Sequence, residues 1–147
     1  MTSAARPTPH VDRDSAAYWD ALARRELVLQ RCRACERHRF PSLPACPYSR
    51  DERADAVRAR GTGALYSWIV VHRAFSPAFE ADVPYAVGTV ELDEGARMLG
   101  RVEAPGGGVP SLAAGLRVHV AFRDHAARGD APAWTEAYFV AEGDGRG

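Results

Sequence analysis

All three cysteines of this 147-residue chain fall between positions 32 and 46. Cys32 and Cys35 form a C-x-x-C motif. Cys46 opens a second turn, C-P-Y-S, in which Ser49 stands where another C-x-x-C would have its last cysteine. Paired turns of this kind are typical of zinc ribbons, which hold a tetrahedral Zn²⁺ between two hairpin turns, and thiolates suit this borderline-soft ion. The spacing therefore predicts a zinc-ribbon-like module in which the fourth ligand position is altered.

The fourth ligand is the open point of this motif, because a serine hydroxyl does not readily ionise. His38, three residues past Cys35, and Asp51, just beyond Ser49, are candidate substitutes, and water is a third. Three alternatives stay open: a structural zinc with a substitute ligand, an empty ribbon with reduced cysteines in a small core, and a catalytic zinc with a bound water. No companion general base supports the last. A thioredoxin-like redox pair is not expected, since no βαβ pattern surrounds the C-x-x-C.

Charge divides the chain into two parts. The net formal charge is zero, with 19 basic and 19 acidic residues, and every basic residue is arginine. Residues 24–60 hold ten arginines against five acids, whereas residues 61–147 hold seven against eleven. The basic part could meet a phosphate-bearing ligand or an acidic partner. The neutral total weighs against a nucleic-acid-binding protein, although zinc ribbons and OB-folds both bind single strands.

Hydropathy and cysteine content predict a cytoplasmic protein. No apolar run approaches the ~20 residues that span a bilayer, and the first ten residues lack the apolar segment of a secretory signal. Three cysteines, two of them in a C-x-x-C, fit a reducing compartment better than a disulfide scaffold.

A short helix is predicted before the cysteine motif, over residues 15–25, with Asp14 as its N-cap. Tyr18 and Trp19 share one apolar side of this helix. These rings pack either on the chain's own core or on a partner protein.

The rest of the chain has the alternating pattern of β-strands. Residues 50–60 are either a linker or the return strand of the ribbon, and residues 123–133 are expected to be a loop. Trp68 is expected in the core because its neighbours alternate. We expect strands at 27–31, 64–72, 85–92, 97–103, 116–122 and 134–142. Five strands after a small cysteine module favour a closed five-stranded OB-fold barrel.

These elements suggest four segments. They are an N-terminal arm and helix at 1–26, a zinc-ribbon-like module at 27–60, an OB-fold domain at 61–142, and a glycine-rich tail at 143–147.

The order of the motifs resembles a known family. YWDALARREL runs into LVLQRCRACERHRFPSLPACP, and GTGALYSWIVVHRAF, DVPYAVGTVELDEGARMLGRV and GLRVHVAF follow. Together they look like the zinc-ribbon/OB-fold acyl-CoA-associated family, once catalogued as a domain of unknown function, number thirty-five. The similarity covers about residues 15–140. It implies a mainly β protein with an N-terminal helix, a small rubredoxin-like zinc ribbon and a five-stranded OB-fold barrel. Ser49 departs from the family's usual cysteine, which bears on the metal and not on the fold.

The resemblance also implies an accessory subunit without chemistry of its own. Members of the family bind thiolase-fold enzymes such as thiolases, steroid side-chain aldolases and acyltransferases, and some accompany hotdog-fold enoyl-CoA hydratases. The small protein helps to form the channel for the CoA ester. A hetero-oligomer is therefore expected, with the catalytic nucleophile in the partner, because the three cysteines here belong to the ribbon.

Candidate contact residues lie on the helix, around the first cysteine turn and on a loop rich in aromatic residues. The loop either lines a pantetheine channel, grips a partner, or folds over the barrel end. The arginines either pair with phosphate oxygens or form a solvated basic face. The candidates are Tyr18, Trp19, Arg33, Arg37, His72, Arg73, Phe75, Phe79 and Tyr85.

A stand-alone acyl-CoA thioesterase or hydratase is the remaining alternative. No nucleophile elbow or comparable context supports a Ser-His-Asp set. Turnover by the purified chain without a partner would establish such an enzyme.

Overall fold

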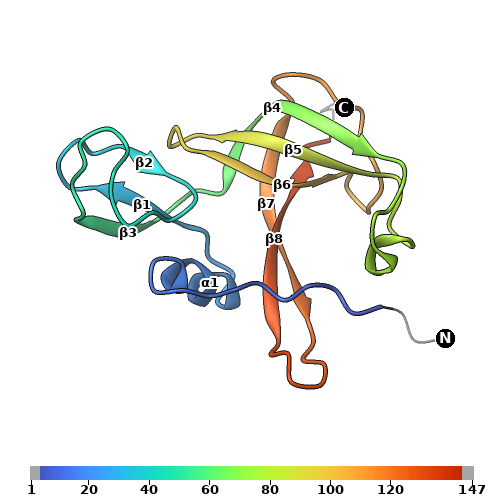
Figure 1. The fold of residues 1–147 in the computed structure, drawn as a ribbon. Coiled ribbons are helices and arrows are strands. Elements are labelled where there is room, and N and C mark those ends of the chain that lie inside the picture. Colours follow the sequence, from blue (N-terminus) through green and yellow to red (C-terminus); the bar gives the residue numbers. More distant parts are fainter. Residues whose placement is uncertain (1–3, 144–147) are drawn as a thin grey trace.

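The computed structural model describes residues 4–143 of the chain, so most of the predicted tail lies outside the described residues (Figure 1). One α-helix precedes eight strands, and a short 3₁₀-helix lies in the loop between β4 and β5. The elements are α1 (Ala16–Ala23), β1 (Val28–Cys32), β2 (His38–Arg39), β3 (Ala54–Arg58), β4 (Thr62–Val71), η1 (Pro77–Phe79), β5 (Tyr85–Leu92), β6 (Arg97–Glu103), β7 (Arg117–His125) and β8 (Trp134–Ala141). The predicted mainly β architecture is confirmed.

The helix begins after a turn closed by two side chains. Ser15 donates its backbone N–H to Asp12 Oδ1 over 2.8 Å, and Asp12 donates its N–H to Ser15 Oγ over 3.0 Å. Ser15 is the residue that precedes the first helical turn. The prediction that Asp14 is the N-cap is wrong. The N-cap is the next residue, Ser15, and it is held by the reciprocal hydrogen bonds with Asp12.

Helix α1 packs on the protein's own core. Leu22 is fully buried and Tyr18 is 9% exposed. The Tyr18 ring lies 4.9 Å from the Trp19 ring and 5.2 Å from the Phe40 ring, and Trp19 in turn meets Trp134 edge-on at 6.1 Å. Tyr18 is therefore a core residue in this chain and offers no docking surface. The helix contacts both the ribbon and the barrel, and it lies beside both in Figure 1.

The ribbon is a three-stranded antiparallel sheet in the order β2-β1-β3. Residues 54–58 pair along the whole of β1, so the return-strand alternative for this segment is the observed one. Ala59 N–H donates to Leu27 O over 2.8 Å just beyond the last pair.

The second sheet closes into a barrel in the order β4-β5-β6-β8-β7. Strand β6 runs parallel to β8, the other pairs are antiparallel, and β4 returns to β7 through Thr62–Ala64. The interior is filled by apolar side chains that are at most 2% exposed: Leu65, Val90, Leu92, Met98, Val102, Val118 and Phe139. The five-stranded OB-fold prediction is confirmed.

Trp68 is a correction to the sequence analysis. A bulge between Leu65 and Ser67 shifts the register of β4, and β7 pairs with β4 only before that bulge. The second half of β4 is therefore not covered by β7. The side chain of Trp68 keeps 37% exposure, so its placement in the core is wrong.

Strand β7 continues to His125, three residues further than expected. In Figure 1, β7 and β8 extend beyond the barrel as a long hairpin. Asp124 accepts two hydrogen bonds from Arg25, at 2.7 and 2.5 Å, and one from Thr135 Oγ1 at 2.8 Å. This carboxylate links the end of the helix region to the hairpin.

Glycine at position 88 is required by close packing inside the barrel. A Cβ atom there would lie 2.5 Å from Leu65 Cδ1 and 2.8 Å from Val102 Cγ2. We predict that Gly88→Ala lowers the free energy of unfolding by about 1–3 kcal/mol through overpacking. Gly143→Ala is the control, because a Cβ there meets no atom within 4 Å. Urea denaturation measures both, and equal stabilities of the two variants would contradict the tight packing.

The Asp124 cluster predicts a pH dependence. The hydrogen bonds from Arg25 and Thr135 lower the pKa of Asp124 to about 2. The unfolded chain has the ordinary value of about 3.9. The carboxylate therefore stabilises the fold above about pH 4, and this contribution is lost as the pH falls towards about 2.

Wild type should consequently be more stable than Asp124→Asn at about pH 5, and the difference should shrink by about pH 3. Denaturation at both pH values tests this. Asp20→Asn, at an exposed helical carboxylate, is the control. A difference that stays constant with pH would contradict the assignment.

Candidate metal centre and contact surface

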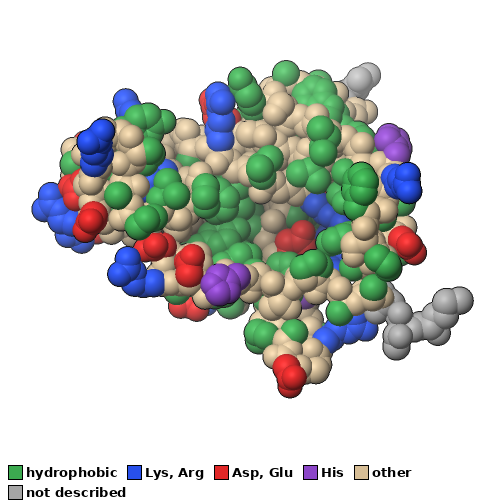
Figure 2. Space-filling model, viewed as in Figure 1, with side chains coloured by type: hydrophobic (Ala, Val, Ile, Leu, Met, Phe, Trp, Pro, Cys, Tyr) green, Lys and Arg blue, Asp and Glu red, His purple; other side chains and the backbone are tan. Residues whose placement is uncertain are grey.

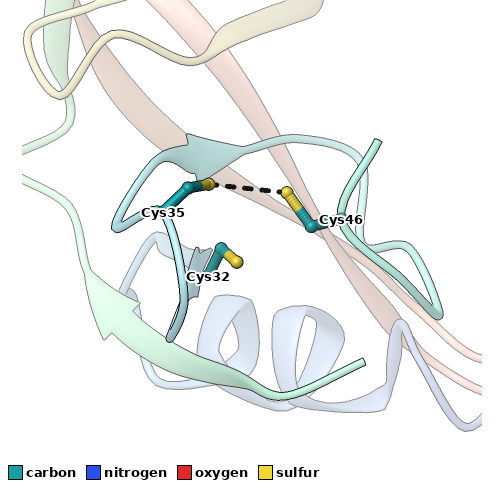
Figure 3. A group of neighbouring side chains, drawn as sticks. All are labelled: Cys32, Cys35 and Cys46. Carbon is teal, nitrogen blue, oxygen red and sulfur yellow. Dashed lines mark hydrogen bonds between the residues drawn. The ribbon is translucent and has the colours of Figure 1, made fainter. Parts of the chain in front are cut away.

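The three cysteine sulfurs converge at one edge of the ribbon (Figure 3). Their Sγ atoms all lie within 4.8 Å of one another, and Cys35 Sγ is 3.6 Å from Cys46 Sγ. Cys32 and Cys46 are buried, and Cys35 is half-buried. Zinc–sulfur bonds of about 2.3 Å in a tetrahedron place the sulfurs about 3.8 Å apart. The thiols therefore fit a single Zn²⁺, to which they would supply three ligands.

Two turns of the same shape position these sulfurs. Glu36 N–H donates to Cys32 O over 3.0 Å, and Arg50 N–H donates to Cys46 O over 2.9 Å. Glu36 and Arg50 also share a left-handed backbone, with φ of 61° and 62°. Both residues follow the fourth position of their turn, so the second turn keeps the ligand-presenting backbone of the first.

Hydrogen bonds favour the metal-binding thiolate form at two of the three cysteines. The Ser49 hydroxyl, followed by the backbone amides of Ser49 and Tyr48, lowers the pKa of Cys46 to about 6. The backbone amide of Cys35, followed by the Ser49 hydroxyl, lowers the pKa of Cys32. The pKa of Cys35 is raised: the backbone amide of Arg37 lowers it, but burial and the neighbouring thiols outweigh that bond.

The two substitute ligands proposed from the sequence do not join the three thiols. Asp51 is bound to Arg53, whose Nη2 lies 2.9 Å from Oδ2 and whose backbone N–H lies 2.9 Å from Oδ1. His38 lies on β2. Among the described residues, the close group of potential metal-ligand atoms consists of the three cysteines alone. Ser49 Oγ, by contrast, is 3.2 Å from Cys32 Sγ.

Part of the loop between β4 and β5 is folded against the barrel. Arg101 lies with its guanidinium carbon 4.1 Å from the Tyr85 ring centre and 5.9 Å from that of Phe79. Arg101 also pairs with Asp82 at 2.6 Å, and Arg6 of the N-terminal arm pairs with the same carboxylate. Phe79 and Tyr85 are half-buried as a result. Phe79 of the loop and Tyr85, the first residue of β5, therefore pack against Arg101 of β6.

The start of the same loop projects into solvent. Phe75 is 96% exposed. His72 and Arg73, the two residues that follow β4, are exposed as well. These three residues form a surface with one large apolar ring and adjacent polar groups.

A hollow lies beside this loop and under the N-terminal arm. It has a volume of about 330 Å³, and Figure 2 shows this face of the molecule hollowed, with charged side chains inside the hollow and apolar ones around it. Its charged lining is already paired, since Arg123 bonds Glu103 at 2.9 Å and Arg101 bonds Asp82. The lining includes Arg6, Asp82, Tyr85, Arg101, Glu103 and Arg123.

The two candidate arginines of the ribbon have partners within the chain. Arg33 bonds Asp55 through Nε at 2.9 Å and Nη2 at 2.6 Å. Arg37 stacks on the exposed ring of Tyr48 at 4.1 Å. Both side chains remain on the surface, so the solvated basic face is what the structure shows for them.

The sequence analysis missed an apolar strip on the outside of the barrel. Tyr66, Ile69 and Leu99 are 54%, 63% and 66% exposed. Leu99 was detectable, because it occupies an outward position of a strand in which Met98 and Val102 point inward. Tyr66 and Ile69 were hidden by the bulge that shifts the alternation of β4.

Within the described part of the chain, no helix is long and apolar enough to cross a membrane.

Two family models match the chain in the order of its two sheets. Residues 19–53 match "ChsH2, rubredoxin-like zinc ribbon domain", and residues 56–123 match "ChsH2, C-terminal OB-fold domain".

Three curated relatives share part of their length with the chain. A probable enoyl-CoA hydratase alpha subunit of Thermomonospora curvata is 47% identical over 96 residues. The 3-oxo-4,17-pregnadiene-20-carboxyl-CoA hydratase alpha subunit of Mycobacterium tuberculosis is 34% identical over 116 residues. A DUF35 domain-containing scaffold protein of Methanocaldococcus jannaschii is 36% identical over 77 residues. These matches cover 65%, 79% and 52% of this chain but only 30%, 36% and 54% of the three relatives.

Solved structures extend the comparison to the fold. A chain of the "Ltp2-ChsH2(DUF35) aldolase" superposes with a TM-score of 0.73 at 36% identity, covering 90% of this chain and 98% of that one. A protein of unknown function from the DUF35 family of Sulfolobus solfataricus superposes with a TM-score of 0.57 at 10% identity, over 75% of this chain and 78% of that one, and shares the fold alone. With ribbon and barrel both matched, and a 36%-identical relative covered almost end to end, the chain belongs to the ChsH2 (DUF35) family of zinc-ribbon/OB-fold proteins.

Proposed function

We propose that this protein is a non-catalytic accessory subunit that binds a thiolase-fold acyl-CoA enzyme and helps to form its CoA and acyl channel. The observation that carries the proposal is Phe75, which is 96% exposed at the end of the barrel. Large aromatic side chains dominate the energetics of protein interfaces when a partner buries them. An aromatic ring held this far into solvent is therefore best explained by a partner that covers it.

The chain's own chemistry supports a subunit and not a complete enzyme. Cys32, Cys35 and Cys46 are grouped in the ribbon, so none of them is free to serve as an acyl-carrying nucleophile. The catalytic nucleophile would belong to the partner. The names of the relatives, an aldolase complex and a steroid-type CoA hydratase subunit, point to CoA esters such as those of steroid side-chain degradation.

The apolar strip on the barrel widens the proposed interface. Ile69 lies on β4 shortly before the exposed loop, and its cross-strand partner is Val87. Leu99 follows on β6, opposite Thr89. Stable interfaces bury about 1,600 Å² in total, which one loop residue cannot supply. The strip and the loop together would give such an interface an apolar centre.

His72 and Arg73 are the proposed ligand contacts in the complex. Both side chains are exposed next to Phe75. A guanidinium group forms forked hydrogen bonds to phosphate oxygens, of which CoA carries several. The loop would then face the phosphates of the CoA ester, while Phe75 contacts the partner.

Replacement of Phe75 tests the interface. Phe75→Ala should weaken assembly with the co-purified partner about tenfold or more, because a central aromatic contact is lost. Tyr48→Ala is the matched control, since Tyr48 is an aromatic residue 69% exposed on the ribbon. Affinity purification from the native host would identify the partner, and titration with it would measure both variants. Equal affinities for wild type and Phe75→Ala would remove the loop from the interface.

Replacement of Arg73 tests the ligand contact. Arg73→Ala should raise the KM of the assembled complex for its CoA ester by about tenfold with assembly unchanged, because a charged hydrogen bond to phosphate is worth about 1.5–3 kcal/mol. Arg58→Ala, at an exposed arginine of β3, is the control. A KM equal to that of wild type would place the phosphates elsewhere.

A second partner class follows from a specific comparison. The 47% identity to a probable enoyl-CoA hydratase alpha subunit favours a hotdog-fold hydratase as the alternative partner. Mass spectrometry of the purified complex distinguishes the two, because it names the co-eluting enzyme. Turnover by the chain alone would instead indicate a stand-alone thioesterase or hydratase, and co-eluting nucleic acid would indicate a single-strand-binding module.

A further inference from the structure

The two turns of the ribbon match in their closing hydrogen bonds. In the first, Cys32 N–H donates to Arg37 O over 3.0 Å. In the second, Cys46 N–H donates to Asp51 O over 2.9 Å. In each turn the donor is the first cysteine and the acceptor is the residue five positions later. Position 49 in the second turn therefore corresponds to position 35 in the first.

The side chain at position 49 is held by the backbone of its own turn. The backbone N–H of Asp51 donates to Ser49 Oγ over 3.3 Å, and the carbonyl of the same residue accepts the closing bond from Cys46. Hydrogen bonds from the backbone orient metal ligands and are part of a metal site. The turn thus fixes the position of the serine oxygen.

Ser49 Oγ also lies beside the group of sulfurs. It is 3.2 Å from Cys32 Sγ, which lies within 4.8 Å of the other two sulfurs. Neither His38 nor Asp51 belongs to the group formed by the sulfurs among the described residues. Asp51 is held instead by Arg53, at 2.9 Å between Oδ2 and Nη2.

We propose that Ser49 Oγ is the fourth ligand, so that the ribbon holds Zn²⁺ in a three-cysteine, one-serine site. A neutral hydroxyl contributes less to the bond with this ion than a thiolate does. The site therefore holds zinc more weakly than a four-thiolate ribbon. Its net charge is also one unit less negative, since three thiolates and one neutral oxygen surround the divalent ion.

Cobalt(II) substitution of the full chain tests this assignment. Co²⁺ reports the number of thiolates through its charge-transfer absorption and the coordination geometry through its visible bands. Wild type should show three thiolates in tetrahedral geometry. Ser49→Cys should show four and bind zinc at least about tenfold more tightly, whereas Ser49→Ala should keep three thiolates, shift the visible bands and bind about tenfold more weakly.

His38→Ala and Asp51→Asn separate the proposed ligand from its rivals. Both variants should retain the wild-type spectrum and zinc affinity. A wild-type spectrum in Ser49→Ala would overturn the proposal, as would a loss of affinity in either rival variant with Ser49→Ala unaffected. Failure of wild type to bind Co²⁺ or Zn²⁺, with binding restored in Ser49→Cys, would equally overturn it.

Circular dichroism and the melting temperature with and without chelator show whether each variant is folded. These readouts need no partner and no substrate, so their result is independent of the proposed accessory role.

Discussion

Burial of one face of α1 holds the two sheets together. Leu22 is completely buried and Tyr18 nearly so, and the Tyr18 ring contacts Phe40 of the ribbon. Full burial of one such side chain stabilises a fold by about 1.5–3 kcal/mol. The exposed Arg25–Asp124 pair adds little by comparison, because surface ion pairs are screened by solvent. Without the apolar face of the helix, the cysteine site and the loop at Phe75 would not be held in one fixed arrangement.

The barrel interior is filled by the chain's own side chains, which leaves no room there for a ligand. Val90 and Phe139 have no exposed surface, and glycine at 88 leaves room only for the side chains already present. Because apolar side chains fill the interior, we expect a ligand or partner to bind the outer strands or the loops. The charged lining of the hollow beside β6 is satisfied within the chain, through pairs such as Arg123–Glu103. The surface that the chain itself leaves uncovered is instead apolar, at Phe75 and along the strip of Tyr66, Ile69 and Leu99.

The sequence was informative where a single rule decided the local structure. The strands at 85–92 and 97–103 coincide with β5 and β6, because strict alternation and a glycine turn leave one register. Prediction failed where contacts between strands overrode the local pattern of apolar and polar residues. A bulge in β4 shifted the alternation that had placed Trp68 in the core. Residues 123–125, expected to be a loop because they are polar, extend β7 because they pair with residues 134–136 of β8. Spacing predicted that the three cysteines come together, but only the structure shows that Ser49 Oγ lies 3.2 Å from Cys32 Sγ.

The attachment of the ribbon to the barrel would allow the fold to tolerate the weaker fourth ligand proposed above. An isolated zinc finger depends on its metal for folding, so the loss of one thiolate there removes much of its stability. In this protein Leu27 and Leu29 of the ribbon are buried in the same core as α1 and the barrel. Part of the ribbon is thus stabilised by apolar packing that does not depend on the ion. Serine at position 49 is therefore compatible with a stable fold, and the surrounding backbone keeps the same left-handed residue after the turn as the C-x-x-C turn has.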